Sequence, residues 1–219
     1  MLNKYAVSSI AFLIGCLMPL QSSIAQPALT LEQQLGQKLL LDFRYFCHQG
    51  ASKQCRTPMT QLPNELANAI SKYNIGGVIL FSENTQSIEQ IITLNQQLQH
   101  AASKSSSALP LFISVDQEGG RVARLPRDVA TSFTGNMSIG ATFEKHDSYF
   151  AAQTAKVMAT ELSALGINVN YAPSIDVNMN PDNPVINVRS FGEDPKRVAT
   201  LGAAQVAGFE NNGIISSLK

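Results

Sequence analysis

Leu111-Phe-Ile-Ser-Val-Asp-Gln-Glu-Gly-Gly-Arg-Val-Ala-Arg-Leu125 is a short apolar run followed at once by charged residues and glycines. The apolar part contains β-branched side chains, and it predicts a buried strand. Asp116, Glu118 and two arginines come immediately after this strand. In parallel α/β proteins, the carboxyl ends of the strands face the ligand crevice. We therefore expect these polar residues to belong to a ligand site.

Strand and helix patterns alternate on both sides of this stretch. We expect strands at residues 38–43, 75–81, 111–115, 167–171 and 213–218, and helices at 64–73, 87–104, 147–165 and 195–210. Such alternation predicts a parallel sheet, which fits either a doubly wound sheet or a β/α barrel. The long connections at 116–146 and 172–194 both follow strands and carry polar motifs, which is typical of the catalytic face of a barrel.

The predicted fold class is therefore α/β, with a (β/α)8 TIM-type barrel. A complete barrel has eight strands and typically about 250 residues. Five strands can be counted before Lys219. We expect the barrel to be truncated after about the fifth strand, with roughly three β/α units missing.

Two motifs carry a resemblance to a known family. Asp-Gln-Glu-Gly-Gly-Arg-Val at 116–122 and Asn-Pro-Val-Ile-x-x-Arg-Ser-Phe-Gly-Glu-Asp-Pro at 183–195 resemble glycoside hydrolase family 3 and, within it, the bacterial β-N-acetylhexosaminidase branch. Segments 75–81 and 172–177 fit the same pattern, and the resemblance runs from about residue 35 to the last residue. It implies the barrel fold and a retaining exo-β-N-acetylhexosaminidase that needs no cofactor. A β-glucosidase or other exo-glycosidase of this family, or a catalytically silent sugar-binding protein, remains open as an alternative.

The resemblance implies four substrate-binding residues. In relatives, the aspartate at the position of Asp116 binds sugar hydroxyls. The arginines at the positions of Arg124 and Arg189 contact the substrate. Lys219 matches the first residue of a Lys-His-Phe-Pro-Gly-His-Gly-like loop whose lysine contacts the sugar. Guanidinium groups suit this work because they present a rigid fork of donors and stay charged. A structural carboxylate at Asp116 and a surface arginine at Arg124 are the alternatives.

The catalytic groups are expected elsewhere. Asp116 and Glu118 could share a face of a strand end, as the paired carboxylates of a retaining glycosidase must, at about 5–5.5 Å. The resemblance argues against that pairing, because the nucleophilic aspartate of relatives lies on a later strand and a histidine beyond the Lys219 position is the general acid/base. We expect no catalytic residue within this chain and no activity from the chain as given. Glu118 is expected to orient Arg121 and fix its loop, and Asp176 could join the site or brace a loop.

Composition excludes several other functions. The formal net charge is zero, so nothing favours a nucleic-acid or anionic-membrane partner. Glu118-Gly-Gly-Arg121 lacks the spacing of a phosphate-binding loop, which disfavours a nucleotide cofactor. A metal site using His48 lacks ligands at recognisable spacing, and we expect none. His48, His100 and His146 are most simply surface or structural residues.

Residues 1–25 are expected to be a signal peptide, leaving 26–219 as the N-terminal part of the catalytic barrel. Lys4 forms a short basic region, residues 5–20 are mostly apolar, and Ser23-Ile-Ala25 is a plausible cleavage site. Cys16 follows Leu13-Ile-Gly, which resembles a lipoprotein processing site; the alternative is a chance cysteine. We expect export to the periplasm or cell envelope, where the carbohydrate partner would be an N-acetylglucosamine-containing oligosaccharide or muropeptide.

Two cysteines remain after signal removal. Cys47 and Cys55 are close in sequence in a chain that we expect to be exported, which favours a disulfide over free thiols.

Overall fold

The computed structural model describes residues 28–48 and 54–219. The predicted signal peptide and Cys16 lie outside these residues, so the predictions for them stay predictions.

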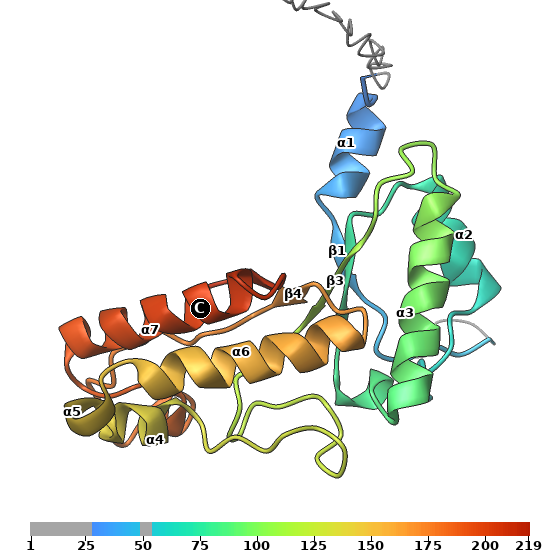
Figure 1. Ribbon diagram of the computed structural model, residues 1–219. Helices are drawn as coiled ribbons and strands as arrows, with labels where there is room; N and C mark the ends of the chain where they lie inside the picture. The colour runs from blue at the N-terminus through green and yellow to red at the C-terminus, as the bar shows by residue number, and fades with distance from the viewer. Residues whose placement is uncertain (1–27, 49–53) are drawn as a thin grey trace, which may run out of the picture.

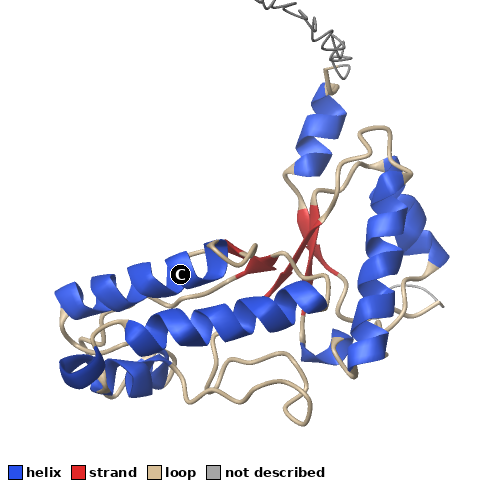
Figure 2. Ribbon diagram, in the orientation of Figure 1, coloured by secondary structure: helices blue, strands red, loops and turns tan. Residues whose placement is uncertain are grey.

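A five-stranded parallel sheet forms the centre of the molecule (Figure 2). Its strands are β1 (Leu40–Asp42), β2 (Gly77–Leu80), β3 (Phe112–Val115), β4 (Val169–Asn170) and β5 (Ile215–Ser216). Each strand pairs with the strand before it in the chain, in the order β1-β2-β3-β4-β5. A doubly wound sheet reverses its strand order at a switch point, whereas a barrel does not. The order therefore identifies five consecutive units of a β/α barrel, and the predicted fold class is confirmed.

One helix precedes the first strand, and the other helices lie between successive strands. They are α1 (Leu31–Gln37), α2 (Asn64–Lys72), α3 (Ile88–Ser103), α4 (Asn136–Ala141), α5 (Phe143–His146), α6 (Tyr149–Ala164) and α7 (Pro195–Glu210), with short 3₁₀ turns η1 (Ser82–Asn84) and η2 (Asn187–Arg189). α2 packs beside α3, and α6 packs beside α7 (Figure 1). No helix of the described residues is long and apolar enough to span a bilayer.

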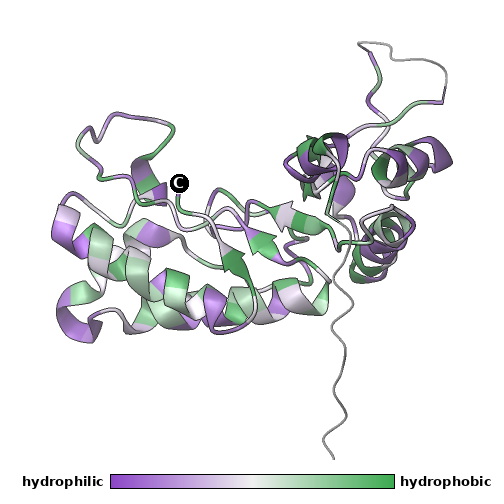
Figure 3. Ribbon diagram, turned by 90° about the horizontal axis from the view of Figure 1, so that it is seen from above, coloured by the Kyte–Doolittle hydropathy of each residue, from purple (hydrophilic) through white to green (hydrophobic). Residues whose placement is uncertain are grey.

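The hydrophobic core lies between the sheet and these helices. Val78 pairs in register with Ile113, and Leu80 pairs with Val115, so these four side chains share one face of the sheet. All four are fully buried in one cluster with apolar residues of α3 and α6, namely Ile91, Leu94, Leu98, Met158 and Leu162. Seen from above, the strands are mainly hydrophobic and the helices carry both hydrophobic and hydrophilic residues (Figure 3). Packing in the core thus holds the strands in place, and the polar loops extend from the ends of the strands.

Local sequence explains where α7 and α3 begin. The Asp194 side chain accepts hydrogen bonds from two backbone N–H groups of α7, and Pro195 occupies the first helical position, where the expected helix also begins. Ser87 caps α3 in the same way by accepting from the Gln90 N–H.

The connection between β3 and β4 differs from the prediction. It contains α4 and α5, which the sequence pattern did not indicate, and α6 begins at Tyr149 rather than Asp147. Asp147 has a φ of 49°, a conformation that a right-handed helix cannot include. This residue therefore separates α5 from α6.

The predicted disulfide is present in the loop after β1. Cys47 and Cys55 are joined, with their Cα atoms 6.0 Å apart. Two backbone hydrogen bonds flank the bridge, from the Phe46 N–H to the Thr57 carbonyl and from the Met59 N–H to the Arg44 carbonyl. The loop is therefore closed by both covalent and hydrogen bonds beside the carboxyl end of β1.

Candidate substrate site

The predicted site residues Asp116 and Lys219 meet at the carboxyl edge of the sheet. Asp116 directly follows β3, and Lys219 follows β5. The Lys219 ammonium donates a hydrogen bond to Asp116 Oδ1 and lies 2.8 Å from Glu118 Oε1. The backbone of Lys219 is held in turn, because its N–H donates to the Pro173 carbonyl and its carbonyl accepts from the Ile175 N–H. Two strand ends are thereby joined around one cation.

Glu118 makes a two-pronged ion pair with Arg189. Arg189 Nε and Nη2 each lie 2.9 Å from a different oxygen of the Glu118 carboxylate. The Glu118 side chain is 2% exposed and the Arg189 side chain 17% exposed, so this pair is largely shielded from water. The hydrogen bond to Glu118 raises the pKa of Arg189 against the opposing effect of burial, and the charges of Glu118, Asp176 and Asp116 raise it further. Arg189 is thus a fixed cation within the site.

The prediction for the partner of Glu118 is wrong. The sequence predicted that Glu118 would orient Arg121, whereas Arg121 is exposed and Glu118 binds Arg189. The N–H groups of Glu118 and Gly119 both donate to the Val122 carbonyl, which closes a tight turn. This turn carries Arg121 at its tip, away from the Glu118 side chain.

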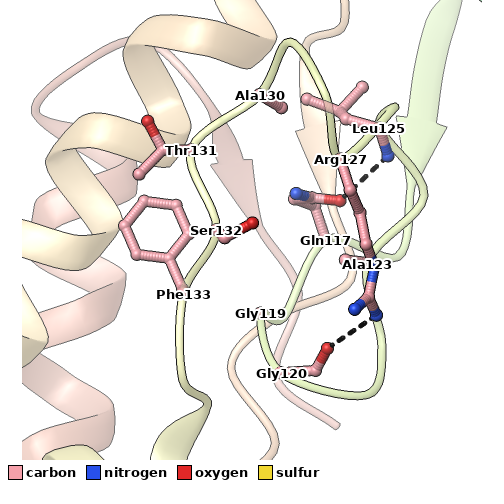
Figure 4. A pocket seen from close by; sticks show the side chains of 10 residues that line it. All are labelled: Gln117, Gly119, Gly120, Ala123, Leu125, Arg127, Ala130, Thr131, Ser132 and Phe133. Carbon is pink, nitrogen blue, oxygen red and sulfur yellow. Dashed lines mark hydrogen bonds between the residues drawn. The ribbon is translucent and has the colours of Figure 1, made fainter.

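Two glycines allow this turn. Gly119 and Gly120 have φ values of 87° and 58°, where a side chain is strained. A Cβ on Gly120 would also lie 3.1 Å from the Gly135 Cα. Figure 4 shows the loop from close by, with the Arg127 guanidinium donating to the Gly120 carbonyl beside a cavity of about 40 Å³.

Arg124 is positioned through Gln117. Its Nη2 lies 3.7 Å from Asp116 Oδ2, which places it in the same cluster. The Gln117 side chain accepts hydrogen bonds from the N–H groups of Arg124 and Leu125 (Figure 4 shows the second). Asn170, fully buried at the end of β4, exchanges two hydrogen bonds of 2.9 Å with the Gln117 backbone. The end of β4 therefore holds the loop that carries Arg124.

Arg189 also has a fixed backbone. Its carbonyl accepts a hydrogen bond from Asn136 in α4, and the next residue, Ser190, donates from its hydroxyl to the Asp176 carbonyl. The Asp176 carboxylate accepts from the Ser174 hydroxyl, so it braces the loop after β4, while its charge also acts on Arg189. Both roles left open by the sequence for Asp176 thus have a physical basis.

All four predicted substrate residues lie in this one cluster, joined through Asp116 and Glu118. It contains three cations, from Arg124, Arg189 and Lys219, and two carboxylates. Such a set can donate to and accept from the hydroxyls of one sugar, because charged groups form the stronger hydrogen bonds. Their roles as substrate ligands stay predictions.

Sequence reasoning missed the residues that support the cluster. Gln117 could have been found from strand alternation, since Asp116 and Glu118 face one side and Gln117 the other. No local pattern of the sequence points to Asn170, because its hydrogen-bond partner, Gln117, lies 53 residues away in the chain. Arg44 and Glu83, at the ends of β1 and β2, were also not singled out.

Within residues 28–48 and 54–219, no three side chains of His, Cys, Asp or Glu are grouped so as to hold a metal ion. His48, His100 and His146 are all exposed, as expected for surface residues.

The chain is similar in sequence to the proteins of one known family. The family model described as the glycosyl hydrolase family 3 N terminal domain matches residues 30–219. The chain is 58% identical over 202 residues to Beta-hexosaminidase A of Pseudoalteromonas piscicida, a match that covers 90% of this chain and 33% of that protein. The chain thus spans about a third of the length of that relative.

Solved structures resemble the fold as well. A family 3 β-N-acetylglucosaminidase from Paenibacillus sp. str. FPU-7 superposes with a TM-score of 0.75 at 38% identity, over 88% of this chain and 33% of that one. NagZ from Neisseria gonorrhoeae gives a TM-score of 0.66 at 34% identity, over 73% and 46% of the two chains. A further structure of that NagZ is a complex with N-trifluoroacetyl-D-glucosamine.

Proposed function

The chain belongs to glycoside hydrolase family 3, and from this premise we propose that the protein is a retaining exo-β-N-acetylhexosaminidase. It removes β-linked N-acetylglucosamine from the end of an oligosaccharide. The observation that carries the proposal is the convergence of Asp116 and Lys219 with Arg124 and Arg189 at the carboxyl edge of the sheet. The printed names of the relatives, β-hexosaminidase and β-N-acetylglucosaminidase, support the reaction class.

Each residue has a proposed role. Asp116 accepts hydrogen bonds from sugar hydroxyls, and Arg124, Arg189 and Lys219 donate to them. Glu118 is a positioning residue, because it holds Arg189 and Lys219 and is itself almost fully buried. We assign neither the nucleophile nor the general acid/base to a described residue, in keeping with the family resemblance.

The test uses the protein produced from its complete coding sequence. It should hydrolyse an aryl β-N-acetylglucosaminide faster than the matching β-glucoside. Asp116→Ala removes hydrogen bonds to a charged group, worth roughly 1.5–3 kcal/mol, so kcat/KM should fall about 10- to 150-fold while the thermal midpoint shows a folded protein. Arg189→Ala should lower the rate similarly. Full activity in both folded variants would refute the site.

The same experiment separates the alternatives. A preference for the glucoside would identify a different exo-glycosidase of the family. Sugar binding by calorimetry with no turnover of either substrate would identify a binding protein. Both outcomes contradict the proposed reaction.

We also propose that the protein is exported and acts in the periplasm or cell envelope. Support comes from the basic, apolar and small-residue segments of residues 1–26. Its substrate there would be an N-acetylglucosamine-containing oligosaccharide or muropeptide, and a lipid on Cys16 would anchor it. Mass spectrometry of the purified cellular protein should find Gln26, or an acylated Cys16, at the N-terminus. An intact Met1 would remove the argument for export.

A further inference from the structure

The three cations of the substrate site are held to different degrees. The Arg189 guanidinium forms two hydrogen bonds of 2.9 Å with Glu118, and the Lys219 ammonium contacts the carboxylates of both Asp116 and Glu118. The Arg124 guanidinium lies 3.7 Å from Asp116, which is too far for a hydrogen bond. Its Nε is buried and has no hydrogen-bond partner among the described residues. The place of this guanidinium therefore depends on how the backbone of Arg124 is held.

The backbone of Arg124 is held on both sides of its Cα. Its N–H donates to the Gln117 side-chain oxygen at 2.7 Å, and its carbonyl accepts from the Thr85 hydroxyl at 2.5 Å. The Gln117 oxygen also accepts from the Leu125 N–H (Figure 4). Gln117 and Thr85 are 2% and 4% exposed, so both hydrogen bonds are shielded from water. Arg124 is thus held by one residue of its own loop and by one residue of the loop after β2.

Buried hydrogen bonds fix the position of Thr85 in turn. The preceding residue, Asn84, is fully buried, and its side-chain amide donates to the carbonyls of Arg44 and Met59 in the loop after β1. The side-chain oxygen of Asn84 accepts from the Phe81 N–H. The loops after β1 and β2 are therefore tied together, and the Thr85 hydroxyl joins the loop after β3 to them.

We propose that Thr85 is a positioning residue for substrate binding, because its hydroxyl holds Arg124 where the guanidinium meets a sugar bound at Asp116. The assignment rests on the proposed function, in which Arg124 is a substrate ligand. The carbonyls of Phe81 and Ser82 each lie 3.4 Å from the Thr85 hydroxyl, so the Arg124 carbonyl is its main acceptor. A guanidinium that is already in place loses less conformational entropy when the sugar binds.

Thr85→Val in the protein from the complete coding sequence tests this role. Valine fills the same space without a hydroxyl, so water can reach the Arg124 carbonyl only if the loop moves. We expect kcat/KM for 4-methylumbelliferyl β-N-acetylglucosaminide to fall about 3- to 10-fold, the contribution of one ordinary hydrogen bond. Thr85→Ser keeps the hydroxyl and should restore most of the activity. Thr93→Val is the matched control and should change nothing, because Thr93 is exposed on α3 and its hydroxyl donates to the Glu89 carbonyl.

A double-mutant cycle separates positioning from a general effect on the fold. In the Arg124→Ala background, the Thr85 hydroxyl has no guanidinium to place, so Thr85→Val should change kcat/KM less than about twofold there. A purely structural role would lower kcat/KM by the same factor in both backgrounds. The fluorescent product of the substrate allows turnover by the slow variants to be measured.

Thr85→Ala also lacks the hydroxyl, and it replaces Thr85→Val in the cycle if the valine variant does not fold. Unchanged activity of the folded variant, equal losses in the two backgrounds, or no recovery in Thr85→Ser would overturn the assignment. In each of these cases, normal turnover by the unmodified protein leaves the proposed function standing. No turnover of the substrate by the unmodified protein overturns both.

Discussion

Replacing Glu118 by alanine should destabilise the protein far more than removing an ordinary surface charge. Its carboxylate makes three contacts with cations: two of 2.9 Å with Arg189 and one of 2.8 Å with Lys219. At roughly 1.5–3 kcal/mol for each hydrogen bond to a charged group, the upper limit is about 5–9 kcal/mol. In the variant, water can replace part of the hydrogen bonding that Arg189 and Lys219 lose, because their side chains are 17% and 29% exposed.

We therefore expect Glu118→Ala to lower the free energy of unfolding by about 3–5 kcal/mol, the typical cost of breaking a buried ion pair by removing one partner. Denaturant unfolding followed by circular dichroism measures this change. Glu144→Ala is the matched control, because Glu144 pairs with Arg197 but is 76% exposed. It should cost no more than about 1 kcal/mol.

A double variant isolates the cause. Glu118→Leu combined with Arg189→Met removes both charges and leaves apolar side chains of similar length. If the stranded Arg189 charge is what costs stability, the double variant should be more stable than Glu118→Ala. The reasoning is refuted if Glu118→Ala costs no more than Glu144→Ala.

Three further outcomes are expected. Replacing Cys47 and Cys55 by serine should lower the free energy of unfolding, measured in denaturant, by about 2–3 kcal/mol. With a reductant present the bridge of the unmodified protein is open, so the variant and the unmodified protein should then be equally stable. Gly120→Ala should cost about 1–2 kcal/mol, because φ is 58° and Gly135 blocks relaxation; an unchanged thermal midpoint would contradict this. Hydrogen bonds from α7 lower the pKa of Asp194, so its stabilisation is complete above the unfolded-state pKa and is lost as the pH falls through the folded value. Asp194→Asn should therefore lose less stability than the unmodified protein between roughly pH 5 and pH 2, and equal losses would exclude this contribution.

Much of the fold could be predicted because its signals are local. The apolar runs before Asp116 and in the other strands, the cap at Asp194 and the polar motifs at strand ends each involve residues within a few positions of one another. Strand and helix periodicity and helix capping act over that same range. The break at Asp147 escaped prediction because nothing in the neighbouring pattern requires a positive φ there.

By itself, the sequence determined the five strands, their order of alternation with helices, and the grouping of Asp116, Arg189 and Lys219 at one edge of the sheet. Only the tertiary structure decided which side chains pair. Glu118 binds Arg189, which is 71 residues away, rather than the nearby Arg121. Which partner is chosen depends on the direction in which each loop leaves its strand and on the register of the strands beneath. Those are set by packing across the whole sheet, and no short segment of the chain contains them.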